Sequence, residues 1–70
     1  MAKEYFVTYF DKEKNKKVDL GPREFYGEEY GEDEGFFNKD EAELAMSAAK
    51  KAATVHHAYG GNTRFIITCR

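Results

Sequence analysis

The chain has 70 residues and a mass of 8.1 kDa; 41% of its residues are hydrophobic, 34% are charged, and its net charge is −2. This length allows one domain, residues 1–70, and aromatic residues at 16% argue against a disordered tail. The longest apolar run, Phe65-Ile66-Ile67, is too short to span a membrane, and the first residues carry no signal-like apolar stretch. The single cysteine, Cys69, forms no internal disulfide, so we expect a cytoplasmic protein.

Residues 4–10 are almost wholly aromatic or β-branched and predict a first β-strand. The polar residues 11–16 then form a turn, and residues 17–20 pair back as the second strand of a hairpin that Gly21-Pro22 ends. Strand alternation gives the first strand two aromatic faces, of which the one with Val7 at its centre is expected to meet the core. The core-facing set is Tyr5, Val7 and Tyr9, and the opposite set is Phe6, Thr8 and Phe10.

The segment 21–38 holds six of the thirteen acidic residues and one basic residue. Within it, Tyr26-Gly27-Glu28-Glu29-Tyr30-Gly31-Glu32-Asp33-Glu34 reads as a short Tyr-Gly-Glu repeat. Glycines lower both helix and strand propensity, and neighbouring carboxylates repel one another. We therefore expect an acidic loop over about 23–37, with Phe36-Phe37 returning to the core.

A helix is expected to begin at Lys39, because Asn38 is a favourable N-cap and Glu41 follows three residues later. Gly60-Gly61 offers a left-handed residue that ends it. At 100° per residue, one mostly alanine side is predicted to pack on the sheet. That side comprises Leu44, Ala45, Ala48, Ala49, Ala52, Val55, His56 and Tyr59.

Residues 63–69 alternate as a last strand whose inward face carries Phe65, Ile67 and Cys69. The fold class predicted is therefore α+β: a three-stranded, mainly antiparallel sheet packed on one helix, in the order β-β-α-β. One helix covers only one face of such a sheet, which leaves Phe6 and Phe10 on the other. Two covers are possible: the segment 25–37 folding across that face, or a second copy or partner protein.

Metal binding, cofactor binding and catalysis are not expected. The adjacent pair His56-His57 diverges by about 100° on a helix, and the acidic loop lacks the ligand spacing of a calcium-binding EF-hand. Cys69 is expected inside as an inert thiol, and Gly60-Gly61 lies at the wrong helix end for phosphate.

Single-stranded nucleic-acid binding is the alternative function, because aromatic strand residues next to basic ones can form a stacking platform. The acidic loop would repel a phosphate backbone, which argues against it. The aromatic residues of this platform are Tyr5, Phe6, Tyr9, Phe10 and Phe65, and the basic ones are Lys12, Lys14, Lys16, Lys17, Arg64 and Arg70.

The run Asp40-Glu41-Ala42-Glu43-Leu44-Ala45 opens a helix that leads into Thr63-Arg64-Phe65-Ile66-Ile67-Thr68. This half of the chain resembles the helix-then-strand unit of very small bacteriophage proteins that disable host machinery, among them RNA polymerase inhibitors and CRISPR inhibitors. The resemblance implies a charged surface that occupies a nucleic-acid-binding site on a host protein.

The acidic loop is accordingly our candidate binding element for a basic surface on a protein partner, with tyrosines as anchors. Its predicted partner-binding residues are Tyr26, Glu28, Glu29, Tyr30, Glu32, Asp33 and Glu34. Phe6 and Phe10 are candidates for a homodimer or partner face.

Overall fold

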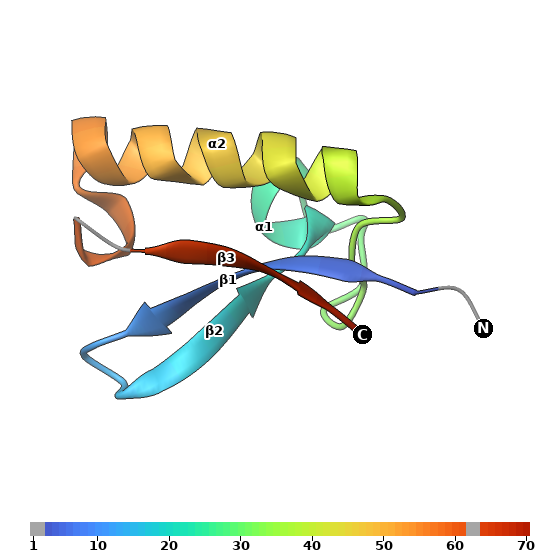
Figure 1. The fold of residues 1–70 in the computed structure, drawn as a ribbon, viewed down its shortest axis with the longest axis horizontal. Coiled ribbons are helices and arrows are strands. Elements are labelled where there is room, and N and C mark those ends of the chain that lie inside the picture. The colour runs from blue at the N-terminus through green and yellow to red at the C-terminus, as the bar shows by residue number, and fades with distance from the viewer. Residues whose placement is uncertain (1–2, 62–63) are drawn as a thin grey trace.

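The computed structural model describes residues 3–61 and 64–70. Two strands, β1 (Tyr5–Asp11) and β2 (Lys16–Leu20), are followed by a short helix α1 (Pro22–Tyr26) and the long helix α2 (Lys39–His56). A 3-10 turn η1 (Ala58–Gly60) leads to the last strand β3 (Phe65–Cys69). The sheet order is β2-β1-β3, both pairings are antiparallel, and α2 lies along one face (Figure 1). This architecture confirms the predicted α+β class and the order β-β-α-β; Asn62 and Thr63 lie outside the described residues.

The centre of the sheet is β1, which pairs with both other strands. Val7 lies opposite Leu20 of β2 and Ile67 of β3. At its start β1 also forms an isolated antiparallel bridge: the N–H of Tyr5 donates to the carbonyl of Phe36 at 3.0 Å, and the N–H of Phe36 donates to the carbonyl of Tyr5 at 2.8 Å. The segment between the helices is therefore tied to the sheet through its last buried residue.

The core lies between the sheet and α2, as predicted for the Tyr5, Val7 and Tyr9 face. Val7 and Phe36 are the largest fully buried side chains, and Phe65 is buried beside them. The buried residues of the helix are all alanines, whose small side chains let α2 lie close to the strands. They are Ala42, Ala45, Ala49 and Ala53.

The predicted helix face is wrong for its two largest aliphatic members. Leu44 is 71% exposed and Val55 is 57% exposed, while Ala48 and His56 are also exposed. Packing the small-residue stripe against aromatic strands rotates the helix, because alanine at 42, 45, 49 and 53 gives the closest approach. Leu44 then points away from the core.

The two ends of α2 are set by the residues that flank it, Asn38 and His57. The side-chain oxygen Oδ1 of Asn38 accepts from the N–H of Glu41 at 2.8 Å, which confirms the N-cap. The helix ends at His56 rather than at the glycine pair, because His57 adopts the left-handed conformation, with φ 55° and ψ 27°. Tyr59 is also left-handed, at φ 55°.

The short helix α1 was not expected, since the acidic loop was predicted over about 23–37. Its first residue is Pro22, and Oε2 of Glu24 accepts from the N–H of Gly21 at 2.8 Å. Proline fixes a helical φ, and this bond satisfies a free N–H at the helix start, so the turn forms without a long helical sequence. Phe25 and Tyr26 consequently lie in a helix and not in the loop.

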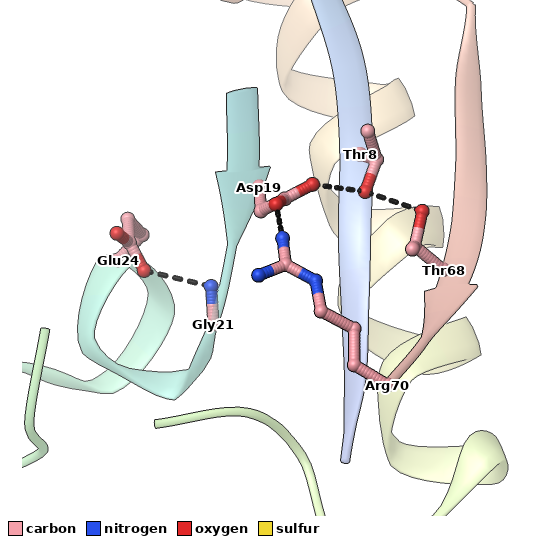
Figure 2. Close-up of polar contacts among 6 residues, drawn as sticks. All are labelled: Thr8, Asp19, Gly21, Glu24, Thr68 and Arg70. Atoms are coloured by element: carbon pink, nitrogen blue, oxygen red, sulfur yellow. Dashed lines mark hydrogen bonds and ion pairs between the residues drawn. The ribbon is translucent and has the colours of Figure 1, made fainter. Parts of the chain in front are cut away.

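The sheet face turned away from α2 carries a polar network at its centre (Figure 2). The hydroxyl of Thr8, which is buried, donates to Oδ1 of Asp19 at 2.7 Å and shares a hydrogen bond of 2.7 Å with the hydroxyl of Thr68. Asp19 is also ion-paired with Arg70, whose guanidinium lies 4.7 Å from the centre of the Phe6 ring. The network joins all three strands.

The predicted burial of Cys69 is wrong: its side chain is exposed. It is the last residue of β3, at the C-terminal end of the strand. None of the helices in residues 3–61 and 64–70 is long and apolar enough to cross a membrane.

Candidate protein-binding site

The acidic segment leaves the sheet after Leu20 and returns to it at Phe36, with a tight approach near each end. An added Cβ on Gly21 would collide with the backbone carbonyl of Glu34, and one on Gly35 would lie 2.9 Å from the Phe6 ring. The segment therefore closes against the sheet instead of projecting as a free loop.

A pair of tyrosine rings organises the outer side of this segment. The rings of Tyr26 and Tyr30 lie 5.9 Å apart, and Tyr26 also stands edge-on to buried Phe36 at 6.2 Å. A guanidinium nitrogen of Arg23 donates to the carbonyl of Tyr30 at 3.4 Å. The two predicted anchors thus form one aromatic surface that is attached to the core.

These tyrosines line a groove between α1 and the first turns of α2. Phe37 is 74% exposed and Leu44 71% exposed, and both contribute to its wall. The groove encloses about 480 Å³ and is lined mainly by apolar side chains. We call it the α1–α2 groove, and define it by Tyr26, Tyr30, Phe37 and Leu44.

Phe37 and Leu44 were expected in the core, but both lie at the surface. The signal was present in the helix: a stripe centred on the alanines places Leu44 on the opposite side. For Phe37, the adjacent Phe36 already fills the core position at the Tyr5 bridge, and consecutive residues of an extended segment point to opposite sides.

The predicted acidic residues fall into separate groups. Glu34 and Glu41 line the α1–α2 groove, and Oε2 of Glu34 accepts from the N–H of Gly31 at 3.2 Å. Glu32 and Asp33 instead border a hollow of about 430 Å³ beneath the sheet. Basic residues share that second hollow: Lys14, Lys16, Lys17 and Arg70.

Glu28 and Glu29 are exposed in the bend that follows α1. The bend begins at Gly27, whose φ of 130° suits glycine, and the carbonyl of Gly27 accepts from the N–H of Tyr30 at 3.4 Å. Three of the seven predicted residues, Tyr26, Tyr30 and Glu34, therefore share one groove. Glu32 and Asp33 border the hollow under the sheet, and Glu28 and Glu29 line neither.

Of the two covers considered for the far sheet face, the acidic segment is the one that covers Phe6, which is buried and not left open to a second copy or partner. Gly21, Gly35 and Arg70 close over its ring, so the acidic segment covers this end of the far sheet face. The other end stays open, where Phe10 and Ile66 are each 47% exposed.

The five aromatic residues proposed as a stacking platform do not share a surface. Tyr9 packs toward α2 with edge-on or tilted contacts to Tyr59 at 5.2 Å and Phe65 at 5.6 Å. Of the five, Phe10 is the exposed one, on the opposite face from Tyr9. The sheet therefore presents one ring where stacking of successive bases uses several.

The rings of Tyr9 and Tyr59, which we call the tyrosine cluster, pack together on the α2 side of the sheet, and the pKa of each is raised. Burial, followed by the nearby charges of Asp11 and Tyr59, raises the pKa of Tyr9 above 10.0. Burial and then the charge of Glu24 raise the pKa of Tyr59 in the same direction. Over residues 3–61 and 64–70, no three histidine, cysteine or acidic side chains gather as a metal site.

Comparisons with protein-family models, with curated proteins and with solved structures find no match to this chain.

Proposed function

We propose that this chain is a non-enzymatic inhibitor or modulator that binds a protein partner through the α1–α2 groove. The observation that supports it is the clustering of exposed apolar side chains. Six large hydrophobic residues are exposed in the described part of the chain, and three of them, Tyr26, Phe37 and Leu44, line this one groove. Exposed apolar patches bordered by polar groups mark contact surfaces more often than chance exposure does.

The charge around the groove defines the partner. Glu34 and Glu41 stand at its wall, and Asp40 and Glu43 border Leu44 on the helix side. Carboxylates at a rim speed the approach of a positively charged surface and disfavour an acidic one. The partner surface is therefore basic and carries apolar side chains that fill the groove.

A basic surface of this kind is common on nucleic-acid-binding proteins. We propose that the chain occupies such a site and blocks it by steric and electrostatic exclusion, as the likeness to small phage inhibitors of RNA polymerase and of CRISPR systems implies. The proposed location is the reducing cytoplasm, in keeping with an exposed free thiol at Cys69.

The test is capture of a partner from lysate of the source organism with tagged wild-type protein and two matched variants. The double variant Phe37→Ala with Leu44→Ala should lose the captured protein, because both side chains are exposed and contribute to the groove. Val55→Ala should keep it, since Val55 is also an exposed side chain of α2 but lies outside the groove. Equal capture by all three proteins contradicts the proposal.

A second comparison separates the two acidic groups. Glu34→Gln with Glu41→Gln should weaken binding and reduce its salt dependence, whereas Glu32→Gln with Asp33→Asn should change it less. The full set of neutralised loop acids should weaken binding most. A gel shift with single-stranded DNA or RNA at low salt should stay negative; a shift there would favour the nucleic-acid alternative.

A further inference from the structure

The two edges of the sheet differ in chemistry. The edge strand β2 begins with Lys16 and Lys17, and charged residues of this kind discourage pairing with another strand. The other edge, β3, reads Phe-Ile-Ile-Thr-Cys and carries no charge over its five residues. An uncharged, β-branched edge is a template for strand addition.

The hydrogen bonds between β1 and β3 show which backbone groups of β3 face outward. Glu4 and Arg70 exchange both of their backbone hydrogen bonds, at 2.8 and 2.9 Å, so they form a hydrogen-bonded antiparallel pair. Such pairs alternate along the ladder, which makes Phe6 with Thr68 and Thr8 with Ile66 the next ones. The N–H and C=O groups of the intervening residues, Phe65, Ile67 and Cys69, therefore point away from β1.

We propose that β3 pairs antiparallel with β3 of a second copy of this chain, with the two-fold axis at Ile67. Ile67 then faces its own counterpart, and Phe65 faces Cys69 of the other copy. All the outward groups of β3 become hydrogen-bonded in this register, roughly six bonds in total. The result is a continuous six-stranded sheet.

A second copy satisfies the outward groups of both chains in one register, because the two-fold axis at Ile67 pairs each outward group with its counterpart. The two α2 helices of the dimer also have room to pack side by side. Because α2 packs on both β1 and β3, a strand spacing of about 4.8 Å places the two α2 helices roughly 10 Å apart, near the usual packing distance.

One contact opposes the pairing, and it makes the dimerisation depend on salt concentration in a way that can be measured. Arg64 of one copy lies opposite Arg70 of the other, and like charges in such a pair repel. Arg70 is already ion-paired with Asp19 and lies over Phe6, which draws its charge toward β2. Added salt should therefore strengthen the dimer, the reverse of the salt effect expected at the acidic groove.

The experiment uses the full chain with Cys69→Ser, which keeps the backbone N–H and removes any disulfide. Light scattering across a concentration series should show the mass rising toward twice 8.1 kDa. Amide hydrogen exchange should show concentration-dependent protection at Phe65, Ile67 and residue 69. The amides of Ile66 and Thr68, which face β1, should be protected at every concentration.

Cys69→Pro supplies the matched variant, because proline removes one outward N–H and is tolerated at a sheet edge. It should lower the dimer fraction strongly relative to Cys69→Ser while the Ile66 and Thr68 amides stay protected, which shows that the sheet is intact. A monomeric mass at millimolar concentration would overturn the proposal. So would a dimer in which the protected amides do not alternate along β3, and neither result bears on the groove.

Discussion

Gly35 lies directly against the ring of Phe6, and the contact holds the acidic segment over the far face of the sheet. A Cβ at position 35 would be 2.9 Å from two ring carbons of Phe6 and 2.8 Å from Cβ of Glu4. Phe6 is buried and its ring has little room to shift. The glycine is needed here for space.

Gly35→Ala should therefore destabilise the fold by about 1–3 kcal/mol, as overpacking of a buried site does. Urea unfolding followed by circular dichroism measures the change. Gly31→Ala is the control in the same segment, because its Cβ would meet only Cβ of Glu34 at an ordinary 3.9 Å. A loss of stability in Gly31→Ala as large as that in Gly35→Ala would show that glycine is needed for backbone freedom and not for this contact.

The orientation of α2 gives the second prediction. Ala49→Leu should cost about 1–3 kcal/mol, because Ala49 is 1% exposed between helix and sheet. Leu44→Ala should leave the free energy of unfolding within about 0.5 kcal/mol, since that side chain points away from the core. Thermal or urea unfolding of both variants checks the rotation. A larger loss of stability in Leu44→Ala than in Ala49→Leu would contradict this orientation and support the helix face predicted from the sequence.

Sequence reasoning found the elements whose signals are local. The aromatic and β-branched composition of β1 favours a strand, and the Asn38 cap forms through a bond to Glu41, three residues along the chain. The rotation of α2 depends instead on which stripe fits the aromatic strand residues, and that is a property of two elements together. The sequence therefore identified α2 but not the exposure of Leu44.

In the candidate site too, some residues could be predicted from the local sequence and others depend on contacts between distant segments. Tyr26, Tyr30 and the acidic residues stand out in the sequence because of their unusual repeat. Phe37 does not, because only the bridge between Tyr5 and Phe36 decides which of two adjacent phenylalanines enters the core. Glu32 and Asp33 face a different hollow because the segment folds under the sheet after Gly31.

The polar network on the far sheet face predicts a graded response to loss of its hydroxyl groups. Thr8→Val removes the partner of both Asp19 and Thr68, and should cost about 1–3 kcal/mol because the site is buried. Thr68→Val should lower the free energy of unfolding by less, since the Thr8 hydroxyl keeps its hydrogen bond to Asp19. Urea unfolding of the two variants measures the difference. Equal losses would mean that the bond between Thr8 and Asp19 contributes nothing.

The tyrosine cluster predicts a loss of stability in alkaline solution. The folded state raises the pKa of Tyr9 and Tyr59, chiefly through burial, so it holds the phenol protons more tightly than the unfolded chain does. This contribution is complete below pH 10.0 and is lost as the pH rises through the folded-state pKa values. Unfolding free energies measured between neutral pH and pH values above 10 should fall.

Lysines also titrate in this range, so the test needs a variant without the two phenols. In Tyr9→Phe with Tyr59→Phe the alkaline decline should be shallower than in the wild type. An identical slope in the two proteins would assign the decline to other groups.

The end of α2 gives the last prediction, from two adjacent histidines with different backbone conformations. His57 is left-handed, at φ 55°, a region that suits glycine better than a residue with a Cβ. His57→Gly should therefore stabilise the fold by about 0.5–1 kcal/mol. His56→Gly should destabilise it by about 1 kcal/mol, because residue 56 is the last of the helix proper. Thermal unfolding of the two variants provides a matched comparison at neighbouring exposed positions, and changes of the same sign would show that α2 does not end where the structure places it.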